Sequence, residues 1–189
     1  KEGMTISGFT HFFDNLLGGS LHGQSGEGLT DFGRAALQRM GEQGVIVDIA
    51  HASPKMVEDI LDASDRPVLL SHGGVKGSCD VGRNLDDSLM RRVAAEGGLV
   101  GIGYWDGAVC DVTPEGIVSS IRYAIDLMGV DHVALGSDYD GATAVLMDTS
   151  ELAVLTQTMI DQGFAEEEIR KVMGENARRF LLENLPERD

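Results

Sequence analysis

The segment Val45–His51 reads VIVDIAH, a short apolar run rich in β-branched residues that ends on a histidine. Two other segments repeat this design, because Pro67–His72 reads PVLLSH and Val133–Asp138 reads VALGSD. Continuous apolar runs of this length predict strands that are buried on both faces, as in a parallel sheet. The carboxyl ends of such strands meet at one mouth of a β/α barrel, where the chemistry is done. We therefore expect the terminal polar side chains to converge.

Strands and helices alternate along the whole sequence. The expected strands are 4–10, 45–50, 68–71, 99–105 and 132–137, and the expected helices are 31–43, 54–63, 86–96, 114–128, 149–162, 166–173 and 175–184. Several helices begin with an N-cap residue, as Ser53 before Pro54 illustrates. Strict alternation predicts an α/β fold with a parallel sheet and right-handed crossovers. Two architectures stay open at this point, a doubly wound sheet or about the last five β/α units of a (β/α)8 barrel.

The length and composition predict a single domain over residues 1–189, with 42% hydrophobic residues to form its core. The formal net charge is -16, which argues against a nucleic-acid partner and against an anionic membrane surface. No apolar run approaches the roughly 18 residues that a spanning helix needs. The two cysteines, Cys79 and Cys110, have no C-x-x-C spacing, so we expect both to stay reduced.

Histidines at matching strand ends predict a metal site. His51 alone has an ordinary interpretation as a capping or buried histidine, but His72 follows 21 positions later in the equivalent place. Neutral imidazoles are good zinc ligands, and a carboxylate such as Asp138 can bind a metal or accept a proton from water. The alternative for Asp138 is an Asx-turn. His11 closes the first expected strand and is either a ligand, a donor to a substrate oxygen, or a core histidine.

Arg83 and Asn84 lie in the Gly-rich loop that follows His72. An arginine offers a bidentate fork for a carboxylate, so beside a metal it would suit a substrate with a free carboxyl end. Its alternative is a surface arginine. His22 and His132 are weaker candidates, because the first lies in a loop and the second at the start of a strand. The aromatic residues Tyr104 and Trp105 are expected to line the pocket.

Several segments, taken in order, resemble the membrane (renal-type) dipeptidase family of the amidohydrolase superfamily, and the bacterial members most of all. The resemblance extends over nearly the whole chain and is carried by GLTDFG at 28–33, VDIAHAS at 47–53, PVLLSH at 67–72, GRNLDD at 82–87, ALGSDYDG at 134–141 and GENARR at 174–179. It implies a (β/α)8 barrel of metal-dependent hydrolase type with two zinc ions bridged by a glutamate. The implied reaction is hydrolysis of dipeptides, including those with a D-residue at the carboxyl side.

The resemblance also implies a role for each candidate residue. His51 and His72 are the ligands of one zinc, and Asp138 binds the other zinc and handles the proton of the attacking water. His11 contacts the scissile carbonyl or its developing oxyanion, while Arg83, with Asn84 beside it, binds the substrate carboxylate. The family's His-x-Asp and bridging glutamate precede the segment matched here by Met4–His11. We therefore expect this chain, as the carboxyl-terminal portion, to bind metal weakly and turn over little substrate.

Two rival functions stay open from the sequence. One is an amidohydrolase that acts on cyclic amides or N-acyl amino acids, and the other is a non-catalytic barrel scaffold or binding protein. A five-strand arc also predicts two open sheet edges and an uncovered interior. Another segment then completes the barrel, the chain forms a homo-oligomer, or these residues are a piece of a longer polypeptide. The location stays open, with the cytoplasm favoured as an expectation, because an export signal would lie upstream of the printed residues.

Overall fold

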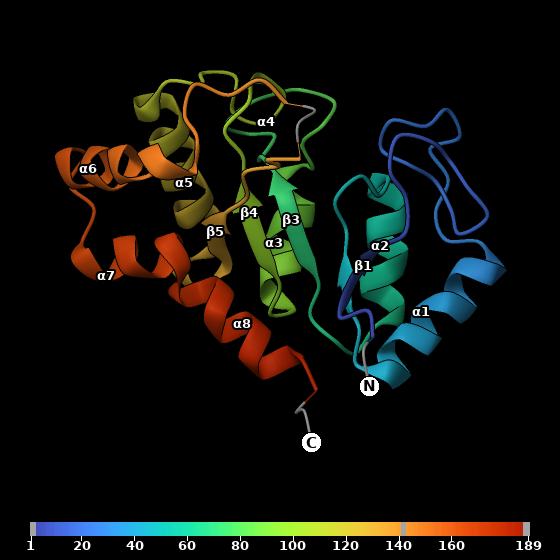
Figure 1. Cartoon of the computed structure of the whole chain (residues 1–189). Helices are drawn as coiled ribbons and strands as arrows, with labels where there is room; N and C mark the ends of the chain where they lie inside the picture. The colour runs from blue at the N-terminus through green and yellow to red at the C-terminus, as the bar shows by residue number, and fades with distance from the viewer. Residues whose placement is uncertain (1–2, 141–142, 187–189) are drawn as a thin grey trace.

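The computed structural model describes residues 3–140 and 143–186 and contains one parallel sheet of five strands in the order β1-β2-β3-β4-β5 (Figure 1). The strands are β1 (Ile6–Gly8), β2 (Ile46–Asp48), β3 (Leu69–Gly73), β4 (Leu99–Ile102) and β5 (Val133–Leu135). All four pairings are parallel, and Gly8 of β1 lies opposite Asp48 of β2. The predicted α/β fold with sequential parallel strands is therefore confirmed, although the strands are mostly shorter than their apolar runs.

Helices follow the strands as predicted. They are α1 (Asp31–Gln43), α2 (Pro54–Ala63), α3 (Asp87–Ala95), α4 (Asp106–Val109), α5 (Pro114–Met128), α6 (Ala153–Asp161), α7 (Glu166–Arg170) and α8 (Asn176–Asn184), with short turns η1 (Val130–His132), η2 (Thr149–Glu151) and the π-helical η3 (Lys171–Glu175). The cap residues act as expected, since the Thr30 side chain accepts from Gly33 N and the Ser53 side chain from Met56 N. The sequence did not predict α4, which begins directly after the expected strand 99–105, and β4 itself already ends at Ile102.

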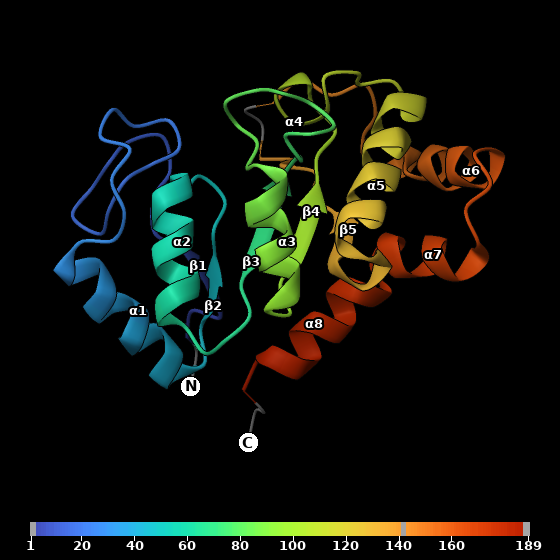
Figure 2. The same ribbon diagram turned by 180° about the vertical axis from the view of Figure 1, so that it is seen from behind.

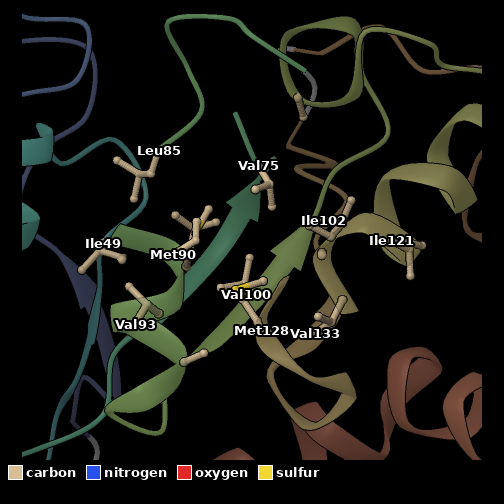
Figure 3. Packing of buried hydrophobic residues seen from close by; sticks show 14 of the residues in the cluster. Ile49, Val75, Leu85, Met90, Val93, Val100, Ile102, Ile121, Met128 and Val133 are labelled. Carbon is tan, nitrogen blue, oxygen red and sulfur yellow. The ribbon is translucent and has the colours of Figure 1, made fainter. Parts of the chain in front are cut away.

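Residues that alternate along each strand enter two separate hydrophobic clusters. Val47, Leu70, Val100 and Val133 belong to the larger cluster, which lies beneath the helices that face the viewer in Figure 2. Figure 3 shows part of it, with Val100 and Ile102 of β4 packed among Met90 and Val93 of α3 and Met128 of α5. This cluster supplies most of the apolar burial that stabilises the sheet.

The opposite face of the strands packs against α8. Ile46, Leu99 and Ala134 form a smaller cluster with Phe180 of α8, and Ala177, Leu181 and Leu185 pack against it. The side-chain amide of Asn176 donates to the carbonyls of Val130 and Val133, which fixes the start of α8 beside β5. The prediction of an uncovered interior is therefore wrong at this end of the sheet, because α8 covers part of it.

Replacing Phe180 by alanine is expected to lower the free energy of unfolding by about 3 kcal/mol, because the ring is 4% exposed and leaves a cavity between α8 and the sheet. Urea unfolding measures the change. The matched control is Leu182→Ala on the same helix, where the side chain is 66% exposed and the expected change is within about 0.5 kcal/mol. Equal effects of the two substitutions would show that α8 does not pack on the sheet in this way.

Candidate functional site

The candidate residues lie at the carboxyl ends of the strands. His11, His51 and Asp138 each stand three positions beyond the last residue of their strand, which is Gly8, Asp48 and Leu135 respectively. The expectation that these residues end the strands directly is therefore wrong, because the backbone leaves the sheet sooner. His72 lies inside β3. The parallel pairing nevertheless brings the equivalent positions of neighbouring strands to one edge of the sheet.

Short distances join these side chains into one cluster. The Nε2 atoms of His51 and His72 are 3.0 Å apart, and His72 Nε2 lies 3.6 Å from Asp138 Oδ1. The His11 ring centroid is 4.4 Å from that of His51. Two imidazole nitrogens bound to one tetrahedral zinc are about 3.3 Å apart, so the histidine pair has nearly the spacing of two ligands.

Two residues of the cluster have strained backbones. His51 has a φ of 64° and Asp138 a φ of 56°, in the left-handed region that residues other than glycine rarely occupy. Such strain costs on the order of 1 kcal/mol at each position and persists where the surrounding structure over-determines it, often at functional sites. The same two residues have the side chains that lie 3.0 Å and 3.6 Å from His72, so the strain occurs at members of the cluster.

Burial favours the neutral form of both central imidazoles. It is the main cause that lowers the pKa of His51 to about 3, and the charge of Arg83 lowers this pKa further. The pKa of His72 is also lowered, again mainly by burial, although the nearby Asp138 carboxylate opposes the shift. A neutral imidazole has a free lone pair, which is the form that binds metal.

The metal-free chain is expected to lose stability as the pH falls from 7 to 5. His51 has a folded pKa near 3 and an unfolded pKa near 6.5, so the unfolded state takes up the proton first. Stability is therefore complete above pH 6.5 and declines below it, by at most about 1.4 kcal/mol per pH unit for this group. Urea unfolding at the two pH values measures the decline. His51→Asn tolerates the left-handed backbone and should show a smaller one, whereas an equal decline in both proteins would contradict the account.

The two histidines differ in what holds them. His72 Nδ1 lies 2.8 Å from the Ser71 hydroxyl, and the Ser71 N–H donates to Asp48 Oδ1, so the end of β3 is tied to β2. His51 Nδ1 is buried and has no hydrogen-bond partner within the described residues. Metal-binding histidines usually have an outer partner on the second nitrogen. The donor set of two imidazoles and a carboxylate fits zinc, but the His51 ring lacks such a partner in this part of the chain.

The cluster falls short of a complete ligand set. Within residues 3–140 and 143–186, no group of three or more His, Cys, Asp or Glu side chains is arranged to hold a metal ion. His51 and His72 form a close pair, while Asp138 lies at the longer distance given above. Gly141, the last residue of the ALGSDYDG segment, is outside the described residues.

Arg83 lies beside the histidine pair. Its Nη2 donates to the His72 carbonyl at 2.8 Å, and its charge is among the causes that lower the pKa of both His51 and His72. Burial lowers the pKa of Arg83 itself, while Asp138 and Asp48 oppose the shift. A half-buried guanidinium next to the cluster is well placed for an anionic ligand.

The neighbouring Asn84 mainly holds the loops together. Its Nδ2 donates to the carbonyls of Cys79 and Ala108, and its Oδ1 is buried with no partner among the described residues. The same two segments are joined by a disulfide between Cys79 and Cys110, with 5.6 Å between the Cα atoms. The prediction of reduced cysteines is therefore wrong. The spacing along the chain gave no sign of the pair, which the adjacency of β3 and β4 brings together.

Aromatic rings and a further histidine lie beside the His51–His72 pair. The Trp105 ring lies 6.0 Å from the His72 ring, and the buried Tyr104 lies 5.8 Å from Tyr139. The His22 ring lies 5.3 Å from that of His51, although its loop position made it a weak candidate. His132, at the start of β5, lies at the other end of the strands, with Nδ1 2.8 Å from the Gly98 carbonyl oxygen. No pattern in the loop sequence marked His22 as a neighbour of His51.

No helix in the part of the chain that the structure describes combines the length and the apolar character needed to cross a membrane. Dipeptidase tcpJ of Claviceps purpurea is 32% identical over 163 residues, which cover 82% of this chain and 38% of that protein. The chain therefore spans little more than a third of the length of this curated relative.

Solved structures give a similar result. An amidohydrolase from Pseudomonas aeruginosa superposes with a TM-score of 0.85 and 26% identity, covering 97% of this chain and 65% of that one. A metallo peptidase from Rhodobacter sphaeroides, liganded with a phosphinate mimic of the dipeptide L-Ala-D-Ala, superposes with a TM-score of 0.84 and 25% identity. The match covers 96% of this chain and 56% of that one. The family model of membrane dipeptidases matches residues 1–185. The chain therefore belongs to the membrane dipeptidase family, Peptidase family M19.

Proposed function

We propose that this chain supplies the carboxyl-side part of a metallo-dipeptidase active site, which hydrolyses dipeptides, including those with a D-residue at the carboxyl side. The observation that carries the proposal is the 3.0 Å approach of the His51 and His72 nitrogens, with Asp138 and Arg83 at the same edge of the sheet. Similarity to a metallo peptidase liganded with a mimic of L-Ala-D-Ala supports the substrate class.

His51 and His72 would hold a zinc ion through their Nε2 atoms, with the Asp138 carboxylate as a further oxygen ligand or as the ligand of a second zinc. When bound, zinc would act as a Lewis acid that polarises the scissile carbonyl and makes water more acidic. Burial lowers the pKa of both imidazoles, which favours the neutral form that binds a metal ion. The expected total is two zinc ions in an intact site.

The remaining chemistry belongs to the side chains of the chain. The Asp138 carboxylate accepts the proton of the attacking water and later returns it to the leaving amine. His11 donates to the carbonyl oxygen as negative charge develops there, since its ring lies next to His51. Arg83 pairs with the terminal carboxylate and fixes the orientation of the substrate. Trp105, whose ring lies 6.0 Å from that of His72, borders the same site.

We further propose that the 189 residues alone bind metal weakly. The support is that the described residues contain no three-ligand group and that His51 Nδ1 has no partner among them. The family resemblance places a His-x-Asp pair and a bridging glutamate in segments that precede the one matched by Met4–His11. Weak metal binding is also what the rival interpretation, a non-catalytic barrel scaffold, would predict.

With zinc added, we expect the chain to hydrolyse dipeptides at least about a thousandfold more slowly than family members that carry all the ligands, because each lost catalytic contribution is worth about 10²- to 10⁴-fold. A panel of dipeptides, N-acyl amino acids and cyclic amides measures both rate and class. Residual activity confined to dipeptides supports the proposal. Preference for another class would contradict the substrate assignment, and robust turnover would show that the absent ligands are dispensable.

A further inference from the structure

The loop between β1 and α1 places a fourth histidine at the edge of the site. The His22 ring centroid is 5.3 Å from that of His51 and 5.3 Å from that of Phe12. Phe12 in turn lies 4.2 Å from the His11 ring. Both His22 and Phe12 are exposed, so they form a rim above the buried His51 rather than part of the core.

Backbone hydrogen bonds fix this rim to the cluster. The Leu21 N–H donates to the His51 carbonyl at 2.7 Å, and the His22 N–H donates to the Ser20 hydroxyl at 3.1 Å. The same hydroxyl donates to the His11 carbonyl. The position of His22 is therefore tied to the backbones of both His11 and His51.

Two carboxylates, Asp14 in the loop and the buried Asp59, hold the β1–α1 loop in place. Asp14 accepts from the N–H groups of Ser20, Gln24 and Ser25 at 2.8, 3.0 and 3.0 Å, which closes the loop on either side of His22. Asp59 of α2 accepts from the Leu29 N–H and so anchors the far end of the loop. A loop held by this many bonds presents its side chains at defined positions, as a binding surface requires.

The ring nitrogens of His22 are available as donors at the edge of the histidine pair. Among the described residues, neither ring nitrogen of His22 has a hydrogen-bond partner. The His22 ring lies 5.3 Å from the His51 ring, and His51 Nε2 lies 3.0 Å from His72 Nε2. Arg83 donates to the His72 carbonyl, so His22 and Arg83 flank the same histidine pair. A carboxylate has about four acceptor positions and an arginine fork uses two, so a bound carboxylate can accept from a second donor.

We propose that His22 is a substrate-contacting residue that donates a second hydrogen bond to the substrate carboxylate bound by Arg83, with Phe12 against the carboxyl-side residue. This inference rests on the proposed dipeptide function. It assigns the β1–α1 loop a role in recognising the free carboxyl end of the substrate. Without this role, Arg83 would be the sole donor to that carboxylate.

The test measures dissociation constants by calorimetry for L-Ala-D-Ala and its carboxamide, with zinc present. His22→Phe keeps the ring contacts with Phe12 and His51 but removes the donor. We expect it to weaken binding of the free acid about tenfold and to leave the carboxamide unchanged, because hydrogen bonds to charged groups are the stronger ones. His22→Gln keeps a donor and should stay within about threefold of the unsubstituted chain.

The outcomes distinguish a failure of the His22 role from a failure of carboxylate recognition by Arg83. An equal effect of His22→Phe on acid and carboxamide, or no effect on either, would overturn the role of His22. Arg83→Met is the reference, and it should remove the preference for the acid. A wild-type chain that does not bind the acid more tightly than the carboxamide, or a preference that survives Arg83→Met, would overturn the carboxylate recognition in the proposed function instead.

Discussion

Replacement of His72 by phenylalanine is expected to weaken zinc binding by the chain more than about 100-fold. Loss of an outer partner of a metal ligand already costs about 10- to 100-fold in affinity, and His72 would be a direct ligand. Its Nε2 lies 3.0 Å from His51 Nε2 and 3.6 Å from Asp138 Oδ1, so His72 is the member of the cluster that contacts both of the other candidate ligands. Competition against a chromophoric chelator measures the dissociation constant.

His132→Phe is the matched control for this experiment. It removes one imidazole from the same chain, but His132 precedes β5 and lies at the opposite end of the strands from the cluster. Its zinc affinity should equal that of the unsubstituted chain. If both substitutions weaken binding to the same extent, zinc binds to surface histidines and the cluster is not a metal site.

Arg83→Met is expected to weaken binding of a free-acid dipeptide about 100-fold, the second large effect. Two charge-assisted hydrogen bonds from a half-buried guanidinium are lost, and the carboxylate then lies near Asp138 and Asp48 with no cation to balance them. Calorimetric titration with the dipeptide measures the change. Arg83→Lys keeps the charge without the fork and should give an intermediate loss.

Arg39→Met controls for net charge. Arg39 lies on α1, forms an ion pair with Glu42 and has a side chain that is 69% exposed, so its loss changes the net charge equally. We expect dipeptide binding to be unchanged within about twofold, since exposed charges are screened over such separations. A comparable loss in this control would mean that the overall charge of the acidic chain, and not the site, determines affinity.

Much of the fold follows from local physics that the sequence reveals. The apolar runs ending at His51, His72 and Asp138 predicted three of the strands, because only buried parallel strands need such continuous hydrophobicity. Thr30 and Ser53 predicted helix starts, since their hydroxyls satisfy free backbone N–H groups. The convergence of residues from β2, β3 and β5 then follows from parallel topology alone.

Features that depend on tertiary context could not be predicted in this way. The pairing of Cys79 with Cys110 depends on two loops that become neighbours only after β3 and β4 pair. His22 reaches the cluster because Asp14 folds its loop back over His51, which leaves no periodic signal. The packing of α8 on the sheet requires knowing which strand face stays open, and alternation along a fully apolar strand does not distinguish the faces.

The central claim is that His51 and His72 form the imidazole pair of one metal-binding position, with the Asp138 carboxylate beside it. X-ray absorption spectroscopy of the zinc-loaded chain tests it most directly, because imidazole ligands give characteristic multiple-scattering features. The account predicts two imidazole nitrogens at about 2.0–2.1 Å and at least one oxygen, with one of the imidazoles lost in His72→Phe. A spectrum of oxygen ligands without imidazole, or one that is unchanged in His72→Phe, would contradict it.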